Sequence, residues 1–351
     1  MKKIADCQRV IVIGASAGGV EALIGLLEAL PPKLDAAICV VSHIPAHTPS
    51  SLHHILQQKT SMPVAPAQDG EILHAGNIYV GVSDRHLMIK DGATRLTRGP
   101  KESRSRPAVD VLFRSAALSF GPRTIGVMLS GMLDDGTAGL WAIKDQDGVV
   151  LVQDPAQAQY PSMPESAIRH VAVDLVAPVE VLAAEIVRLT QEPLPASQDP
   201  APSKRHRLEN LIAEEGNALK GGVMGLGKVS QYTCPDCHGV LVQIEEGSVL
   251  RFRCHTGHAF SIKSLLVEVS EAIDNGLWDT IRALEERVLL LREMSELART
   301  NDSAAVAERS SHQADHIEKH INTLRDLVLD PSIFGHSPGG TYRDLAADGS
   351  E

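Results

Sequence analysis

The chain has 351 residues, of which 43% are hydrophobic and 22% charged, a composition typical of globular proteins with two or three domains. Its formal net charge of −11 argues against nonspecific nucleic-acid binding, and no apolar run approaches the length of a membrane span. Asp6, Gln8 and Arg9 interrupt any signal-peptide-like segment. We therefore expect a cytoplasmic protein without membrane insertion.

Residues 9–190 alternate short apolar runs with segments of helical periodicity. The runs that predict buried strands lie at residues 10–13, 37–41, 78–82, 125–129 and 149–152. A further short strand at 87–89 is followed by Asp91 and Gly92, which predict a hairpin turn. Strands separated by crossover helices indicate an α/β fold with a doubly wound, mostly parallel sheet covered on both faces.

The composition changes after residue 190. The proline-rich segment EPLPASQDPAPSK begins an expected linker over 191–228, which separates a first domain, 1–190, from a small cysteine-containing unit at 229–262. Residues 263–330 carry apolar positions at alternating spacings of three and four, which predict a helical hairpin or coiled coil. We expect the tail, 331–351, to be disordered.

Ser16 lies in the segment GASAGG, directly after the first predicted strand. Neither the dinucleotide pattern G-x-G-x-x-G nor a Walker lysine is present, so a phosphate-binding loop is disfavoured. The glycines permit a sharp turn, and the following helix offers free backbone N–H groups to a developing oxyanion. Two interpretations stay open, an ordinary turn residue and a nucleophile.

Polar residues follow three of the predicted strands. Ser16 follows the first strand, His43 the second, and Asp134 and Asp135 follow the run at 125–129. Because the carboxyl ends of parallel strands meet at one edge of a sheet, these side chains could form a nucleophile, a base and an orienting carboxylate. Their order, serine, histidine, acid, differs from that of the α/β-hydrolases. Each residue alone is also compatible with a turn or cap.

Six motifs extend this pattern over roughly residues 8–190. They are VIGASAGGVEAL, VVSHIPA, GNIYVGVSDRHLMI, RPAVDVLFRSAA, LSGMLDDGTAGL and VQDPAQAQYPSMPESAI. In sequence and order they resemble the catalytic domain of chemotaxis protein-glutamate methylesterases, the CheB family. The resemblance implies that Ser16 is the nucleophile, that His43 is the general base and that Asp135 orients it, with Asp134 a variable neighbour. It also implies an oxyanion hole formed by the backbone N–H groups of Ala17 and Met132.

The implied activity is hydrolysis of γ-glutamyl methyl esters, with deamidation of glutamines as a further activity and no cofactor for catalysis. The implied partners are methylated chemoreceptor cytoplasmic domains or similar signalling proteins. Typical members carry an N-terminal receiver domain, whereas this sequence starts at the first strand of the catalytic domain. We therefore expect regulation from elsewhere, and a methylated target other than a chemoreceptor stays an alternative.

The remaining motif is a cysteine cluster with the spacing C-x2-C, sixteen residues, C-x3-H. Apolar runs at 240–244 and 249–253 flank EEGS, which predicts a hairpin between the two cysteine turns. The expected ligands of a structural zinc ion in this zinc-ribbon-like unit are Cys234, Cys237, Cys254 and His258. His255 as fourth ligand, or a metal-free hairpin with reduced thiols, are the alternatives.

Two other classes of function compete with the esterase. A signalling scaffold would keep the fold and use its tail for binding, including helix-mediated self-association. A zinc-ribbon nucleic-acid regulator is disfavoured because the ribbon carries Asp236, Glu245 and Glu246 and lacks a basic, aromatic face. The sequence favours the esterase, since the candidate nucleophile, base and orienting acid are all present together with the glycine-rich turn.

Overall fold

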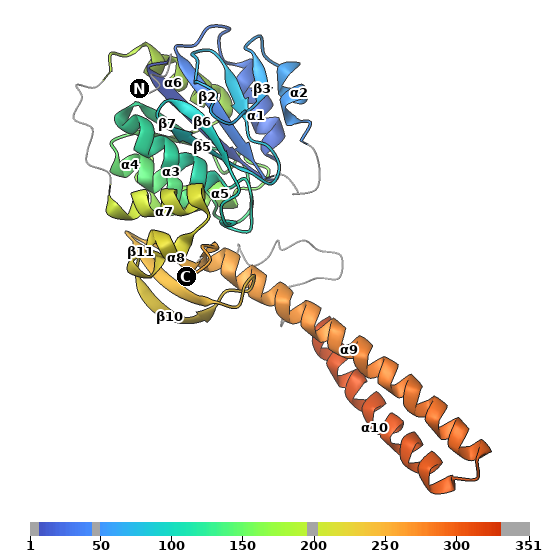
Figure 1. Ribbon diagram of the computed structural model, residues 1–351. Coiled ribbons are helices and arrows are strands. Elements are labelled where there is room, and N and C mark those ends of the chain that lie inside the picture. The colour runs from blue at the N-terminus through green and yellow to red at the C-terminus, as the bar shows by residue number, and fades with distance from the viewer. Residues whose placement is uncertain (1–6, 44–49, 195–202, 331–351) are drawn as a thin grey trace. The chain divides into compact units, whose positions relative to one another are not determined.

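The computed structural model describes residues 7–43, 50–194 and 203–330 (Figure 1). The chain forms two compact units, Met1–Leu265 and Leu266–Glu351. The tail at 331–351, which we expected to be disordered, and the proline-rich part of the expected linker at 195–202 lie outside the described residues. Among the described residues, none of the helices combines the length and the apolar character that a membrane span requires.

A seven-stranded parallel sheet forms the centre of the first unit, in the order β3-β4-β2-β1-β7-β8-β9. The strands are β1 (Arg9–Ala15), β2 (Ala36–Ser42), β3 (Val64–Pro66), β4 (Ile78–Val80), β7 (Thr124–Met128), β8 (Val149–Gln153) and β9 (Leu175–Ala177). The chain winds outward from β1 in both directions, through β2 on one side and β7 on the other. The expected doubly wound α/β fold is therefore confirmed, with the switch point at β1.

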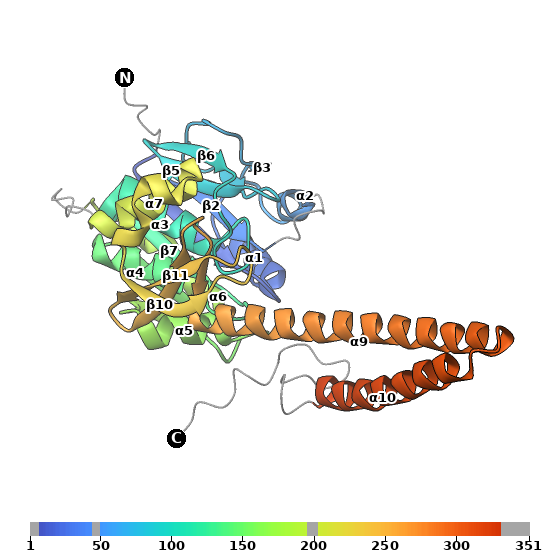
Figure 2. The same cartoon turned by 60° about the horizontal axis from the view of Figure 1, so that its bottom comes forward.

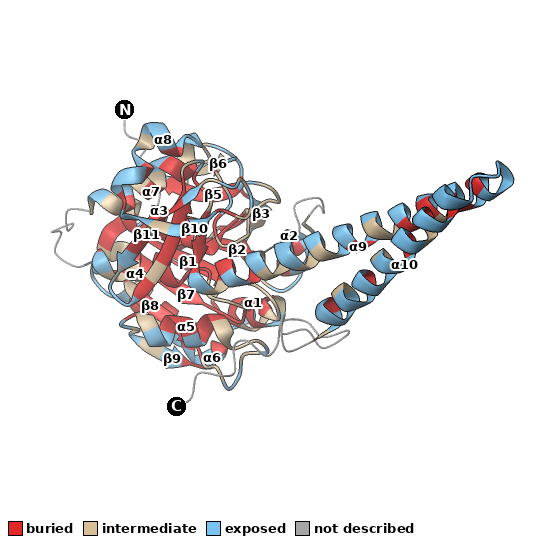
Figure 3. Cartoon of the chain, turned by 90° about the horizontal axis from the view of Figure 1, so that it is seen from below, coloured by how far each residue is buried: buried red, intermediate tan, exposed pale blue. Residues whose placement is uncertain are grey.

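Helices cover both faces of this sheet. One face carries α1 (Gly19–Glu28), α2 (Leu52–Gln57) and α6 (Val179–Gln191); the other carries α3 (Val109–Phe120), α4 (Thr137–Asp145) and α5 (Ser162–His170). Along β1, Ile11 and Ile13 pack into the first core, while Val10 and Val12 pack into the second. Because β1 packs against a core on each face, its sequence is a continuous apolar run. Figure 3 shows that the strands of the sheet are buried.

A separate hairpin joins β5 (His86–Lys90) to β6 (Ala93–Thr97). Its turn is formed by Asp91 and Gly92, whose φ angles are 50° and 73°. These left-handed conformations suit the Asp-Gly pair that predicted the turn. A short 3-10 helix, η1 (Gly121–Arg123), then leads into β7.

The interval that we expected to be a linker contains helices. They are α7 (Lys204–Glu215), α8 (Ala218–Gly221) and the 3-10 helix η2 (Val223–Gly225). Figures 1 and 2 show α7 beside α3, and His206 and Glu209 of α7 are buried. The composition of 192–203 indicated a linker, and that prediction extended too far along the chain: helix α7 begins at Lys204 and places apolar Leu208, Leu211 and Ile212 at helical spacing.

A four-stranded antiparallel sheet completes the first unit. It consists of β10 (Lys228–Thr233), β11 (Val240–Glu246), β12 (Val249–Cys254) and β13 (Ala259–Ser261), in that order. β11 and β12 form the hairpin expected around EEGS. Leu241, Phe252 and Phe260 supply a small core beside the cysteines.

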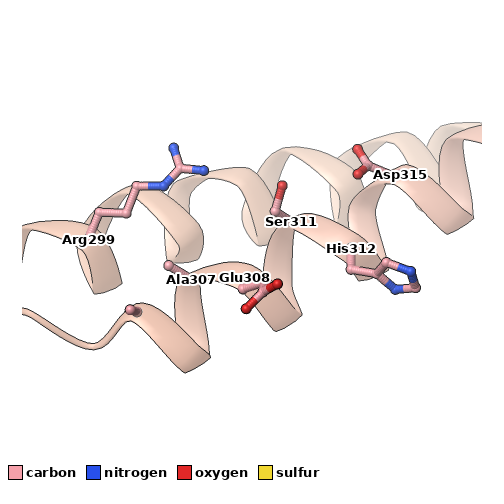
Figure 4. A pocket seen from close by; sticks show the side chains of 7 residues that line it. Arg299, Ala307, Glu308, Ser311, His312 and Asp315 are labelled. Carbon is pink, nitrogen blue, oxygen red and sulfur yellow. The ribbon is translucent and has the colours of Figure 1, made fainter.

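The second unit is a helical hairpin. Most of α9 (Ile262–Thr300) and all of α10 (Ala304–Leu329) belong to it, and the division between the units falls within α9. Ile281 and Val288 of α9 are buried with Ala314 and Ile321 of α10. Near the loop that joins the helices, an open pocket is lined mainly by polar side chains (Figure 4).

Candidate active site

Ser16 lies in the turn between β1 and α1. Its N–H donates to the Ser130 carbonyl oxygen at 2.9 Å, and its carbonyl oxygen accepts from Gly19 N–H at 2.9 Å. Gly18 has a φ of 65°, and a Cβ there would lie 2.6 Å from Gln159 Oε1. Only glycine fits this turn, which holds the serine at the carboxyl end of the central strand.

His43 directly follows β2, the strand beside β1. Its Nδ1 lies 3.0 Å from Ser16 Oγ, and its Nε2 lies 2.7 Å from Asp135 Oδ2. With the proton on Nε2, the ring donates to Asp135 and accepts the serine hydroxyl at Nδ1. The structure thus brings together the serine, histidine and aspartate that the strand ends predicted.

Asp135 lies in the loop between β7 and α4, and its side chain is only 2% exposed. Besides His43, Oδ2 accepts from Val109 N–H at 2.7 Å, and Oδ1 accepts from Asp110 N–H at 3.1 Å. These donors belong to the first turn of α3, whose N-terminus favours negative charge. No sequence pattern marks this support of Asp135, because it depends on how α3 packs.

The neighbouring carboxylate of Asp134 has a different partner. Its Oδ1 accepts a hydrogen bond from Ser261 Oγ at 2.6 Å. Burial raises the pKa of Asp134, an effect that the Ser261 hydrogen bond opposes. Asp135 therefore faces the histidine, whereas Asp134 faces the cysteine-containing sheet.

Asp110, at the start of α3, is a third buried carboxyl group in this region. Its Oδ1 accepts from Gly139 N–H at 2.6 Å. Burial and the nearby Asp135 carboxylate raise the pKa of Asp110 well above its ordinary value, which favours its neutral form.

The expected oxyanion donors lie on the two loops that meet at Ser16. Among the described residues, neither Ala17 N–H nor Met132 N–H has a hydrogen-bond partner. A Cβ at Gly131 would lie 2.9 Å from Ser16 Cβ and 2.0 Å from Met163 Sδ, so the loop that carries Met132 passes directly against the serine. Two free backbone donors on these loops suit a developing oxyanion.

The cysteine cluster forms a second candidate site. The ligand atoms of Cys234, Cys237, Cys254 and His258 all lie within 4.8 Å of one another. Cys237 Sγ is 3.6 Å from Cys254 Sγ, and Cys234 Sγ is 3.6 Å from His258 Nδ1. Tetrahedral zinc bonds of about 2.3 Å to sulfur and 2.1 Å to nitrogen require ligand separations of roughly 3.5–4 Å. The four side chains therefore fit zinc.

His255, the alternative fourth ligand, is not part of this cluster. Its ring packs against Gly239, two residues after Cys237, where a Cβ would lie 2.1 Å from the ring.

Known proteins resemble this chain over about half of its length, and the family model places that half at its N-terminal side. A family model described as CheB methylesterase matches residues 11–186. A protein-glutamate methylesterase/protein-glutamine glutaminase of Anaeromyxobacter dehalogenans is 41% identical over 52% of this chain and 53% of its own length. A protein named as a putative enzyme of the same kind from Leptospira interrogans is 37% identical over 52% of this chain and 96% of its own.

A solved structure of the same family also matches about half of the chain. The crystal structure of the Thermotoga maritima CheB methylesterase catalytic domain matches with a TM-score of 0.50 and 32% identity, over 52% of this chain and 98% of that one. The chain spans about half the length of several of the curated relatives that it matches.

Proposed function

The chain belongs to the CheB methylesterase family, and on that premise we propose that its first domain is a serine hydrolase that removes methyl esters from glutamyl side chains of chemoreceptor-like signalling proteins. The observation that carries the proposal is the chain of short contacts from Ser16 Oγ to His43 Nδ1, 3.0 Å, and from His43 Nε2 to Asp135 Oδ2, 2.7 Å. The names of the relatives, protein-glutamate methylesterase/protein-glutamine glutaminase, support the substrate class.

In the proposed reaction His43 Nδ1 takes the hydroxyl proton while Ser16 Oγ attacks the ester carbonyl carbon. The carbonyl oxygen becomes negative and accepts from the N–H groups of Ala17 and Met132. The imidazolium, held by Asp135, gives its proton to the leaving methoxide, and methanol departs. Water then attacks the acyl-serine, with His43 again as base, and releases the glutamate side chain and the free serine.

The same steps would deamidate a glutamine side chain, with ammonia as the leaving group in place of methanol. The proposed reactions use no cofactor, since every proton moves between Ser16, His43, the substrate and water. We place the protein in the cytoplasm, where the cytoplasmic domains of methylated receptors would be its partners.

We further propose that Cys234, Cys237, Cys254 and His258 hold a structural zinc ion. Their separations support this, and so does the small core of the sheet, in which Leu241, Phe252 and Phe260 carry most of the apolar packing. A unit of this size usually needs a metal to fold. When bound, the ion would supply folding free energy and no catalytic chemistry.

The second unit is proposed to mediate self-association. On α9, Leu290, Met294 and Leu297 are 61%, 51% and 64% exposed and follow a spacing of four and three residues. Such a seam is typical of a helix that packs against another helix. The substitutions Leu290→Glu and Leu297→Glu should then lower the molar mass measured by light scattering, without altering esterase activity.

The esterase proposal is tested by following labelled methanol released from a chemoreceptor cytoplasmic fragment methylated with a labelled methyl group. We expect release by the wild type and a loss on the order of 10³-fold or more in Ser16→Ala. Ser270→Ala is the matched control, because among the described residues its hydroxyl bonds only the Leu266 carbonyl oxygen of its own helix. A folded wild type that releases no methanol would favour the scaffold alternative.

A further inference from the structure

The strand β13 connects the cysteine cluster to the catalytic domain. It begins at Ala259, directly after the cluster residue His258. Ala259 N–H donates to the Lys101 carbonyl oxygen at 3.1 Å, and its carbonyl oxygen accepts from Ser103 N–H at 2.8 Å. One strand of the cysteine-containing sheet is therefore also paired with a loop of the catalytic domain.

Ser261 ends β13, and its hydroxyl bridges two elements. Its Oγ accepts from Ser264 N–H at 3.0 Å and lies 3.1 Å from Ser264 Oγ, both in the first turn of α9, and it donates to Asp134 Oδ1 at 2.6 Å. Asp134 is the direct neighbour of Asp135. A single short loop thus carries one carboxylate held by β13 and one carboxylate that faces His43.

A buried ionic network joins the same two parts of the chain. Arg253 of β12 contacts Glu102 at 2.8 Å and Glu209 at 3.1 Å. Glu102 also pairs with Arg114 of α3 at 2.9 Å, and Glu209 pairs with Arg251 at 2.8 Å. None of these five side chains is more than 6% exposed. Separating these side chains would leave buried charges without partners. The ionic contact between the cysteine-containing sheet and the catalytic domain should therefore persist throughout the catalytic cycle.

The cysteine-containing sheet therefore contacts both elements that position the Asp135 carboxylate, its own loop and helix α3. It contacts the loop of Asp135 through Ser261, and it contacts α3, whose first N–H groups bind Asp135, through Arg253, Glu102 and Arg114. Ser261 follows His258 by three positions, about 10 Å along an extended strand. A displacement of the cysteine cluster would therefore be transmitted through β13 to the loop that carries Asp134 and Asp135.

We propose that Ser261 is a positioning residue for the catalytic site, and that metal bound at the cysteine cluster keeps Asp135 aligned with His43 through β13 and the Ser261–Asp134 hydrogen bond. This inference rests on the proposed esterase function and assigns a regulatory role to the cysteine unit. Loss of the metal, by chelation or thiol oxidation, lowers turnover without any change in the three catalytic residues.

The test uses the full chain and compares Ser261→Ala, which removes the hydroxyl, with Ser261→Thr, which retains it. We expect Ser261→Ala to lower kcat roughly three- to tenfold with KM little changed, because it removes one hydrogen bond to a carboxylate. Ser261→Thr should restore most of the loss, and Ser270→Ala, in helix α9 directly after β13, should match the wild type. Asp134→Asn, which keeps the shape and removes the charge, should also lower kcat.

A second measurement does not depend on activity. Amide hydrogen exchange in residues 129–136 should accelerate in Ser261→Ala, and equally in wild type stripped of metal by a chelator, and zinc should reverse the latter effect. Because both changes act through one contact, stripping the metal from Ser261→Ala should add little further acceleration.

The outcomes separate the two proposals. A wild type that hydrolyses no methyl ester but shows the coupled exchange contradicts the proposed function and supports the link through β13. Unchanged kcat and unchanged exchange in both Ser261→Ala and Asp134→Asn overturn the positioning role. Additive effects of metal removal and Ser261→Ala, or a purified chain whose exchange does not respond to zinc, overturn the route through the cluster.

Discussion

His43 Nε2 lies 2.7 Å from Asp135 Oδ2, and the same oxygen accepts a hydrogen bond of 2.7 Å from Val109 N–H. With Asp110 N–H on the other oxygen, three N–H groups converge on one carboxylate. The aspartate cannot rotate without losing at least one of them. The imidazole is therefore oriented by a group that is itself fixed by the start of α3.

The first prediction concerns Asp135→Asn. An amide has one acceptor oxygen, so its NH₂ group must face either the His43 and Val109 donors or the Asp110 donor. We expect kcat to fall by about 10³- to 10⁴-fold, with residual catalysis from the oxyanion donors. Methanol release measures the loss, and thermal unfolding checks that the variant is folded. An activity within tenfold of wild type would contradict the proposed role of Asp135.

The second prediction separates the two histidines of the cysteine unit. His258 belongs to the cluster, whereas His255 packs against Gly239. Purified chain should contain about one zinc ion, as a four-ligand structural site implies. His258→Ala should lose most of its zinc to a competing chelator, and His255→Ala, the matched control, should retain it. Elemental analysis after dialysis decides this, and equal retention by both variants would remove His258 from the ligand set.

The proposed catalytic residues could be located from the sequence because the strands that precede them are buried on both faces. Val10 and Val12 enter one core while Ile11 and Ile13 enter the other, so the strand shows an unbroken apolar run, and Ser16 follows where it ends. The geometry that unites Ser16, His43 and Asp135 then follows from strand order in a parallel sheet.

The support for Asp135 and the attachment of the cysteine unit could not be predicted in this way. Glu209 lies in α7 and is buried although it is charged, and its partners Arg251 and Arg253 follow 42 and 44 residues later. A buried charge has no local sequence signal, since its stability depends on partners that only the fold brings together.

The third prediction concerns Glu102→Gln. Burial alone would raise the pKa of Glu102, but the guanidinium groups of Arg114 and Arg253 hold it at about 2, below its ordinary value of 4.5. Removing this charge leaves the arginines short of a partner. We expect the free energy of unfolding to fall by about 3–5 kcal/mol at neutral pH. Glu185→Gln, which breaks the exposed pair with Arg188, should cost less than about 1 kcal/mol.

The pH dependence of stability gives this prediction a second readout. Because the pKa of Glu102 is depressed on folding, its contribution is fully present above pH 4.5 and is lost as the pH falls toward 2. Wild type should therefore lose more stability than Glu102→Gln across this window. Denaturant unfolding at several pH values measures the difference, and parallel curves for the two proteins would contradict the assigned pairing.

The fourth prediction compares fragments that end at residue 190 and residue 265. The proposed catalytic domain, 1–190, contains the whole parallel sheet, so we expect the shorter fragment to fold. It loses Glu209, the Thr97 hydrogen bond to the Ala213 carbonyl oxygen, and the cover that Ala213 gives to Met88 and Val111.

The shorter fragment should therefore melt at least about 5 °C below the longer one, since a few kcal/mol lower the melting temperature of a domain of this size by several degrees. The fragment 1–265 should match the full chain, because the second unit has its own core. Thermal unfolding of all three proteins tests this. Equal melting of the two fragments would show that α7 and the cysteine unit do not stabilise the catalytic domain, and an insoluble 1–190 would move its boundary beyond α7.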